Sequence, residues 1–362
     1  MSSFLSRLRQ RVLRFSVRQR DLQEKADIET ALLLTSWWNH IVLQGQEDRS
    51  VLQQEAERVQ QMAGFQQVRT LKENLDTQVL RMFKAIHAAR KIQTDPAKLC
   101  EIYGQSQKGS NDENDPTPQH PQHYQEVENW HPPKGARGRQ QASMHSRGGT
   151  GSREEYRGRA DVDSVRKALR QQLGFTLRRG PSTIPMAGEG IFLEGRVRIG
   201  TMVGLYPGLV YLQEHVRKPE EVAQLFPDPD MFLFQRYDRV MVDGRAAEEQ
   251  QPNEYALAHL CNHGKPNVMA LAYDFAQDPL DWGGFPKELR PYIPNSYTRP
   301  RSLLGSPDQS ALMQSVVLLT TTDVEDGEEL LLNYRLNPKH GKESLPSWYV
   351  PVDVEEDSRR WA

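Results

Sequence analysis

The chain has 362 residues, a net charge of −2 and a hydrophobic share of 37%. This length fits two modest domains or one domain with extensions, and the low apolar share indicates that part of the chain does not pack into a core. Near-neutral charge gives no reason to expect nucleic acid as the main partner. Two cysteines are too few for a disulfide framework or a four-cysteine zinc site, and no run reaches the roughly 18 apolar residues of a membrane-spanning helix. We therefore expect an intracellular protein without a structural metal.

Residues 1–20 form a basic segment with six arginines and no acidic residue, in which Leu5, Leu8, Val12 and Phe15 recur at helical spacing. An amphipathic, arginine-rich and acid-poor start is typical of a mitochondrial transit peptide. The alternative is a basic helix that packs on the rest of the chain or binds a partner. The compartment thus stays open between the mitochondrion, the nucleus and the cytoplasm.

Residues 21–100 are predicted to be helical. Apolar residues fall three or four positions apart, as on one face of a helix: Val68, Leu71, Leu75, Val79, Met82 and Ile86. The pair Asp95-Pro96 ends the pattern, because proline disfavours helical geometry in the residue before it. Trp37 and Trp38 are expected to be buried. The region is either a small packed bundle or a helical arm that binds a partner through residues 21–98.

Residues 101–160 are rich in Gly, Pro, Ser, Gln and Asn and poor in aliphatic residues. Such a segment cannot bury enough apolar surface to offset the entropy of ordering it, so we predict a disordered linker. Its arginines could contact RNA, although a solvated linker is the simpler interpretation. The loosely spaced His120, His123 and His131 do not indicate a metal site.

Residues 161–340 are predicted to form a globular domain, followed by a tail at 341–362. A short helix in VRKALRQQLG precedes the strand-like runs GIFLEG, TMVGLYPGLVYL, DMFLFQRY, DRVMVDG, NVMALAYDF and SVVLLTTTDV. A long insertion at about 277–309 carries one short helix in PKELRPY. The expected class is α+β, with a mostly β domain of short strands after an α-helical region.

Four clusters in this domain carry the chemistry. In order, they are Gly188-Glu189-Gly190-Ile191-Phe192, Leu205-Tyr206-Pro207-Gly208, Cys261-Asn262-His263 through Asn267, and Gly327-Glu328-Glu329-Leu330 ending in Asn333-Tyr334. Each cluster alone is weak, but their order and spacing together resemble the SET-domain family. Within it the chain looks most like the group called SET domain-containing protein nine. The resemblance covers roughly residues 174–334.

The resemblance implies a SET fold with a knot-like crossover and S-adenosylmethionine as the cofactor. Gly188, Glu189 and Gly190 are then expected along the cofactor, since glycine lets backbone approach a ligand closely. Asn262 and His263 correspond to the family's Asn-His pair, which contacts the cofactor and lies in the crossover. Tyr206 is a second aromatic candidate near the cofactor.

The resemblance also implies that Tyr334 is catalytic and contacts the cofactor, with its hydroxyl at the reacting centre. The family's usual Arg-Phe before Asn-His is here His259-Leu260, and its usual Ser-Cys after it is Gly264-Lys265. No cysteine-rich segment flanks the domain to complete a substrate channel with zinc. The C-terminal tail instead offers Leu345, Trp348, Tyr349 and Trp361, which are expected to fold over the domain.

Two main hypotheses follow from these residues. The first is a protein-lysine methyltransferase whose partner is a protein substrate that carries the target lysine. The second is a catalytically inactive SET-fold scaffold that binds partners through its helical region. Methylation of a group other than lysine is a third alternative.

Overall fold

The structure is a computed structural model that describes residues 19–45, 48–94, 164–212, 232–248, 253–276, 284–298, 311–336 and 348–355. These residues fall almost entirely in one compact unit, which joins the segments Met1–Arg90 and Val165–Ala362. The predicted basic segment at 1–20 lies outside the described residues except for its last two positions, and the predicted linker at 101–160 lies wholly outside them. The domain boundaries remain predictions.

Within the described residues up to 94, the chain forms three α-helices. They are α2 (Gln19–Trp38), which continues into a short π-helical turn at Asn39–Leu43, α3 (Arg49–Gln61) and α4 (Gly64–Thr94). The N-terminus of α3 is capped by Asp48, whose carboxylate accepts from the Ser50 backbone N–H at 2.9 Å. α4 ends at Thr94, directly before the predicted Asp95-Pro96 break. None of the described helices is long and apolar enough to cross a membrane.

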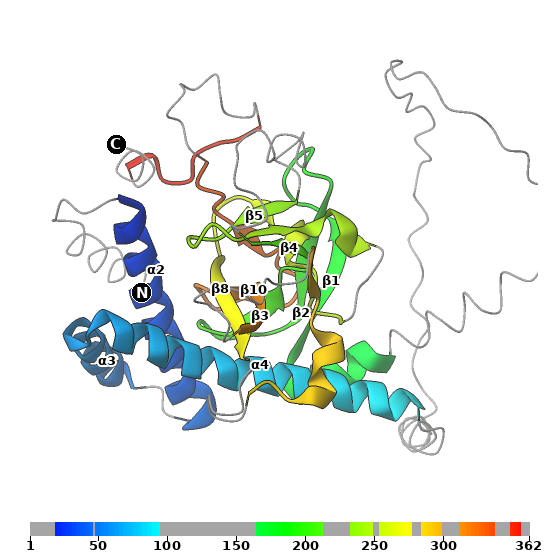
Figure 1. The fold of residues 1–362 in the computed structure, drawn as a ribbon, viewed down its shortest axis with the longest axis horizontal. Coiled ribbons are helices and arrows are strands. Elements are labelled where there is room, and N and C mark those ends of the chain that lie inside the picture. Colours follow the sequence, from blue (N-terminus) through cyan, green and yellow to red (C-terminus); the bar gives the residue numbers. More distant parts are fainter. Residues whose placement is uncertain are drawn as a thin grey trace, which may run out of the picture. The chain divides into compact units, whose positions relative to one another are not determined.

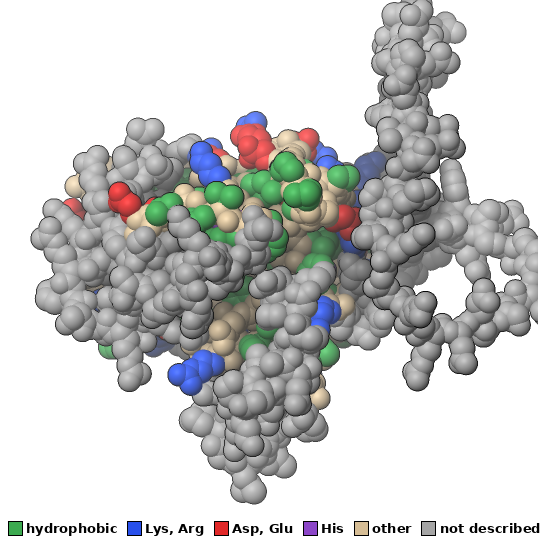
Figure 2. All heavy atoms as spheres, turned by 90° about the horizontal axis from the view of Figure 1, so that it is seen from above, with side chains coloured by type: hydrophobic (Ala, Val, Ile, Leu, Met, Phe, Trp, Pro, Cys, Tyr) green, Lys and Arg blue, Asp and Glu red, His purple; other side chains and the backbone are tan. Residues whose placement is uncertain are grey.

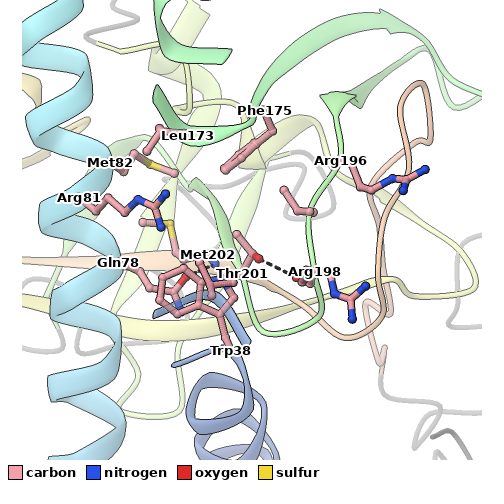
Figure 3. A pocket seen from close by; sticks show the side chains of 12 residues that line it. Trp38, Gln78, Arg81, Met82, Leu173, Phe175, Arg196, Arg198, Thr201 and Met202 are labelled. Atoms are coloured by element: carbon pink, nitrogen blue, oxygen red, sulfur yellow. Dashed lines mark hydrogen bonds between the residues drawn. The ribbon is translucent and has the colours of Figure 1, made fainter. Parts of the chain in front are cut away.

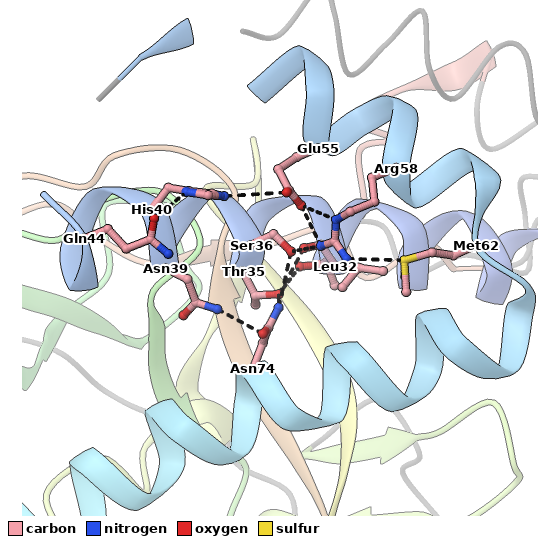
Figure 4. Close-up of polar contacts among 11 residues, drawn as sticks. Leu32, Thr35, Ser36, Asn39, His40, Gln44, Glu55, Arg58, Met62 and Asn74 are labelled. Atoms are coloured by element: carbon pink, nitrogen blue, oxygen red, sulfur yellow. Dashed lines mark hydrogen bonds and ion pairs between the residues drawn. The ribbon is translucent and has the colours of Figure 1, made fainter. Parts of the chain in front are cut away.

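Polar side chains hold the three helices together along their buried seams (Figure 4). Asn74 of α4 donates to Thr35 Oγ1 of α2 at 3.1 Å and accepts from Asn39 at 2.9 Å. On the other side of α2, Glu55 of α3 pairs with Arg58 and with His40. The helical face predicted on α4 is buried between Leu71 and Ile86, whereas Val68 is half exposed. Trp37 and Trp38 are buried as expected.

In the part of the chain that the structure describes, short strands form four small sheets (Figure 1). β1 (Phe175–Pro181) pairs with β2 (Glu189–Gly195), and β10 (Ala311–Thr320) lies between β3 (Met202–Leu205) and β8 (Val268–Ala276). A four-stranded sheet has the order β5 (Leu233–Gln235), β6 (Met241–Asp243), β4 (Gly208–Tyr211) and β9 (Asn295–Tyr297). The fourth sheet joins β11 (Leu331–Leu332) to β7 (Asn262–His263).

The predicted α+β class, with helices first and mostly short strands after them, is confirmed. The helix at 164–173 and the six strand-like runs are present. The insertion contains the expected short helix as a 3₁₀ turn, Lys287–Tyr292, but it also supplies β9, which pairs in parallel with β4. β1, β7, β9 and β11 lie outside the strand-like runs predicted from the sequence. Two arginines break the apolar alternation of β1, and one of them, Arg178, stacks over the Phe192 ring at 4.8 Å.

The helices pack directly on the strands, and α4 runs along one side of them in Figure 1. The side-chain amide of Gln78 on α4 donates to Gly200 O at 2.9 Å and accepts from the Met202 backbone N–H at 2.7 Å. On the same helix, Asp76 accepts from the Tyr273 hydroxyl of β8 at 2.7 Å. Binding of a separate partner through residues 21–98 remains a prediction.

Candidate functional site

The third and fourth sequence motifs meet in the structure, as the expected crossover requires. β7 and β11 pair in parallel, with Asn262 opposite Leu331 and His263 opposite Leu332. Asn267 extends this pairing with its side chain, because its amide donates to Glu329 O and accepts from the Leu331 backbone N–H, both at 2.8 Å. A side-chain amide thus completes the hydrogen bonding of two very short strands.

Tyr334, the predicted catalytic residue, is fixed at this junction. Its hydroxyl donates to Cys261 O at 2.9 Å, and its backbone N–H donates to Nδ1 of His263 at 3.2 Å. Burial, and next the proximity of Cys261, raise the pKa of the Tyr334 hydroxyl. The hydroxyl is therefore neutral at physiological pH. It can orient a ligand through its lone pairs, but it cannot act as a base.

Both ring nitrogens of His263 are engaged by the protein. Since Nδ1 accepts from Tyr334, Nε2 carries the proton and donates to Val350 O at 2.7 Å. One ring face is stacked on Tyr349, with centroids 4.4 Å apart. A contact between His263 and a cofactor would therefore have to come from its backbone or from another part of its ring.

Asn262 lies against the first motif. Its Nδ2 donates to Glu189 O at 2.8 Å and to Glu329 Oε1 at 3.3 Å, so both amide hydrogens are used. This arrangement fixes the amide orientation and leaves Oδ1 as an acceptor for a ligand. A methyl group at Gly190 would fall on the Glu329 carboxylate and within 3.2 Å of Asn262 Nδ2. Close packing of these three residues therefore requires glycine at position 190.

Glu329 is the acidic centre of the site and was not among the predicted site residues. Its carboxylate accepts from Ser182 Oγ at 2.7 Å, from the Thr183 backbone N–H at 2.6 Å and from the Thr183 hydroxyl. Burial favours the neutral acid, but the hydrogen bonds from Thr183, Ser182 and Asn262 outweigh it and lower the pKa of Glu329. Its position in the Gly-Glu-Glu-Leu run is the sequence feature that could have identified Glu329 as a site residue. Ser182 and Thr183 gave no signal, because Ser and Thr are ordinary turn residues.

Glu189 and Gly188 of the first motif are exposed, whereas Ile191 and Phe192 are buried in the core. The Glu189 carboxylate forms an ion pair with Arg179 across the β1–β2 hairpin. Gly188 has a φ of 76°, and a methyl group added there would meet nothing within 4 Å. The backbone at Gly188 is therefore open on the side where other residues carry Cβ.

Tyr206 lies deeper than the other predicted residues. It is 7% exposed, and its ring packs edge-on to His259 with centroids 6.5 Å apart and against Phe234 at 5.6 Å. Burial first, then the nearby Tyr334 and Asp243, raise the pKa of the Tyr206 hydroxyl. The structure thus brings Tyr206 close to Tyr334, and it brings all seven predicted residues into one neighbourhood.

Part of the C-terminal tail folds over this neighbourhood, as expected for its aromatic residues. Trp348 packs edge-on to Tyr334 with centroids 6.0 Å apart, and the Tyr349 hydroxyl accepts from the Leu336 backbone N–H at 3.2 Å. Leu345 and Trp361 lie outside the described residues. Figure 2 shows hydrophobic side chains exposed on one face of the molecule. Trp348 and Val350 are among the exposed large hydrophobic residues, at 49% and 70% exposure.

The described residues contain no cluster of three or more His, Cys, Asp or Glu side chains suited to a metal ion. Cys261 is buried, and burial raises the pKa of its thiol, which does not favour the thiolate that metals bind. His120, His123 and His131, from which no metal site was expected, lie outside the described residues.

A hollow lies between α2, α4 and the β2–β3 connection (Figure 3). Trp38, Met82 and Phe175 line it, and Arg81 stands over the Trp38 ring at 5.9 Å. Two further arginines on its wall, Arg196 and Arg198, form ion pairs with Glu325 and Asp323. Its lining residues belong to none of the four motifs, so the hollow is separate from the candidate site.

Comparison with known proteins gives two sequence relatives. SET domain-containing protein 9 of Homo sapiens is 28% identical over 196 residues, covering 46% of this chain and 60% of that protein. The same protein of Pongo abelii is 28% identical over 196 residues, covering 46% of this chain and 66% of that protein. The chain thus spans less than two thirds of the length of each relative. No family model matches the sequence.

Among solved structures, an autoinhibited ctPRC2 bound to S-adenosylmethionine matches with a TM-score of 0.27 and 15% identity, over 50% of this chain and 17% of that one. An apo ctPRC2 with mutations in Ezh2 matches with a TM-score of 0.27 and 16% identity, also over 50% and 17% of the two chains. The two sequence relatives carry the resemblance: this chain is similar to SET-domain proteins, and to the SET domain-containing protein 9 group among them, as its four motifs indicated.

Proposed function

We propose that the chain transfers a methyl group from S-adenosylmethionine to a lysine side chain of another protein. The observation that carries the proposal is the neutral Tyr334 hydroxyl, held by Cys261 O where the third and fourth motifs meet. The name of the sequence relatives, SET domain-containing protein 9, supports the same assignment. S-adenosylmethionine is the cofactor that a resemblance to SET-domain proteins implies.

The residues around the junction fit this cofactor. The adenine amino group and the ammonium group of S-adenosylmethionine are donors, and Asn262 Oδ1 is an oriented acceptor. The open backbone at Gly188 leaves room for a ligand against the first motif. When bound, the cofactor supplies a methyl group on a positively charged sulfur.

The protein must present the lysine as a neutral amine in line with that methyl group. Free lysine titrates near 10.4, so only about one side chain in a thousand is neutral at pH 7.4. A buried site lowers the pKa of an amine, and the buried Tyr206 and the partly buried Tyr334 give the junction this low-polarity character. The Tyr334 hydroxyl, which donates to Cys261 O, has lone pairs left to accept an N–H of the amine. The lysine ammonium would lose its proton to solvent before the reaction, which leaves the nitrogen lone pair free. With the cofactor bound, that lone pair would displace sulfur from the methyl carbon, so that the C–N bond forms as the C–S bond breaks and neutral S-adenosylhomocysteine leaves.

The alternative is a SET-fold scaffold that binds partners without transferring methyl groups. One observation favours it: both ring nitrogens of His263 are occupied by Tyr334 and Val350, so this side chain offers no hydrogen bond to a cofactor. The altered neighbours His259-Leu260 and Gly264-Lys265 point the same way. Methylation of a group other than lysine would use the same junction.

The test is transfer of a radiolabelled methyl group from S-adenosylmethionine to proteins of a cell extract by the full chain. Tyr334→Phe removes one hydroxyl and keeps the ring, and turnover should fall by about 10²-fold, as when one preorganised polar group is lost. Tyr273→Phe is the matched control, because its buried hydroxyl donates to Asp76 of α4 and not to the motif junction. Cofactor binding without transfer by any of these proteins would establish the scaffold instead. Equal turnover by Tyr334→Phe and the wild type would remove Tyr334 from the mechanism.

A further inference from the structure

The first described helix, α2, reaches the segment that carries Tyr334. Asp27 of α2 accepts two hydrogen bonds from the Arg335 guanidinium, from Nη1 to Oδ2 at 2.7 Å and from Nη2 to Oδ1 at 3.2 Å. This is a bidentate ion pair between residues 308 positions apart. Asp27 is 3% exposed, so water screens the pair little.

Two more side chains donate hydrogen bonds to the Asp27 carboxylate. The Tyr237 hydroxyl donates to Oδ2 at 2.7 Å, and Gln23 Nε2 donates to Oδ1 at 3.0 Å. Asp27 therefore ties three parts of the fold together: α2, the turn between β5 and β6, and the chain after β11.

Arg335 is a position where the backbone needs external support. Its φ is 52°, a left-handed conformation that non-glycine residues rarely adopt. Its backbone N–H donates to Asn333 Oδ1 at 3.0 Å, and its side chain is held by Asp27. Since Arg335 directly follows Tyr334, the turn at Arg335 sets the direction in which the Tyr334 segment leaves β11.

We propose that Asp27 is a positioning residue for Tyr334, acting through Arg335, so that α2 is part of the catalytic unit. The proposal rests on the proposed function for its catalytic readout. Its structural basis does not depend on that function, because it concerns the order of the backbone after Asn333, which hydrogen bonds report. The backbone N–H of Tyr334 donates to His263, that of Arg335 to Asn333, and that of Leu336 to the Tyr349 hydroxyl.

The first variant is Asp27→Asn in the full chain, which keeps the shape of the side chain and removes its charge. The matched control is Asp76→Asn, which weakens another contact between the helices and the strands, the one to the Tyr273 hydroxyl. Arg335→Lys is a second variant that keeps the charge but loses the bidentate geometry. It tests the proposal if Asp27→Asn does not fold.

Amide hydrogen exchange at Tyr334, Arg335 and Leu336 is the readout that needs no activity. In Asp27→Asn and Arg335→Lys, exchange there should accelerate about tenfold or more, while Asp76→Asn leaves it unchanged. Turnover should fall about tenfold in Asp27→Asn and in Arg335→Lys, with the affinity for S-adenosylmethionine changed only a few-fold.

Unchanged exchange at these amides in both variants, or equal acceleration in the Asp76→Asn control, overturns the proposal, since the pair would then support only overall stability. Accelerated exchange with unchanged turnover also overturns it. If the wild type transfers no methyl group to any extract protein, the proposed function fails by itself. Exchange at the three amides then still decides whether Asp27 orders the Tyr334 segment.

Discussion

The backbone N–H of Tyr334 donates to Nδ1 of His263, so the third sequence motif holds the backbone of the fourth. Because Nδ1 is an acceptor, the proton resides on Nε2, which in turn donates to Val350 O in the C-terminal tail. One imidazole thereby connects Tyr334 to the segment that folds over it. The role of His263 that follows from this geometry is to order the protein around the junction, whereas Asn262 retains a free acceptor for a ligand.

Asn262→Ala should weaken the binding of S-adenosylmethionine about tenfold or more, because a lost hydrogen bond to a buried polar ligand costs about 1–3 kcal/mol. Calorimetric titration of the folded protein measures the affinity. Asn39→Ala is the control, since it removes an amide that donates to Asn74 of α4, away from the motif junction. His263→Ala should also lower the melting temperature, because it breaks the bonds to both Tyr334 and Val350. Unaltered affinity in Asn262→Ala would exclude its amide from the cofactor site.

Glu329 should make the protein acid-sensitive. The hydrogen bonds from Thr183, Ser182 and Asn262 prevail over burial and keep the folded-state pKa of Glu329 below its ordinary value of 4.5. A carboxylate with a lowered pKa stabilises the fold fully above the unfolded-state value, and the contribution is lost as the pH falls through the folded-state value. Glu329→Gln should thus be less stable than the wild type at pH 7, and the gap should narrow as the pH falls below about 4.5. Melting temperatures between neutral and acidic pH measure this difference, and a constant gap would contradict it.

Gly190→Ala should destabilise the domain by about 1–3 kcal/mol, the usual cost of overpacking. The added methyl group would lie 2.9 Å from Glu329 Cδ, and the buried carboxylate cannot move without giving up the bonds to Ser182 and Thr183. Chemical denaturation measures the loss. In Gly64→Ala, at the start of α4, the methyl group meets nothing within 4 Å, so stability should hardly change. Equal stability of the Gly190→Ala protein and the wild type would show that the site is looser than these contacts require.

Residues 1–20 should direct a fused fluorescent reporter to mitochondria if the segment is a transit peptide, as its six arginines and lack of acids suggest. Replacing Arg7, Arg9 and Arg11 with glutamine is the control, because it keeps the apolar spacing and removes half of the charge. A diffuse or nuclear reporter would assign the segment to packing or to an acidic partner.

The sequence predicted the elements of this fold that repeat a regular pattern. The helical face from Leu71 to Ile86 is apolar at every third or fourth residue, and β8 and β10 are rich in apolar residues. β9 could not be predicted, because three polar or aromatic residues in a Pro-rich insertion become a strand only through pairing with β4. Tertiary context, and not local propensity, creates such short strands.

The same distinction holds for the site. The predicted residues are brought together because four motifs in order specify a fold, even though each motif alone is ambiguous. Asp27 and Thr183 could not be found in this way. Asp27 lies 308 residues before Arg335, and Thr183 lies 146 residues before Glu329. Nothing local distinguishes an aspartate on a helix or a threonine in a turn from the many that face solvent.

The C-terminal tail should contribute to turnover and to stability through different side chains. Trp348 is half exposed and packs edge-on to Tyr334, whereas Tyr349 is 7% exposed and is stacked on His263. Trp348→Ala should therefore cost less stability than Tyr349→Ala, since a half-exposed ring gives up a smaller share of its area to water. If the proposed function holds, the same change should lower turnover on a protein substrate several-fold, because it removes a wall beside Tyr334.

Tyr349→Ala should instead cost about 3 kcal/mol, as for other buried aromatic residues, and should release the tail from His263 and Leu336. Denaturation curves and methyl-transfer rates, measured on the same preparations, separate the two effects. Phe65→Ala is the control for loss of an exposed aromatic ring, since Phe65 is 75% exposed at the start of α4. It should change neither quantity. If Phe65→Ala and Trp348→Ala alter turnover equally, the tail has no specific place beside Tyr334, and its packing on His263 serves stability alone.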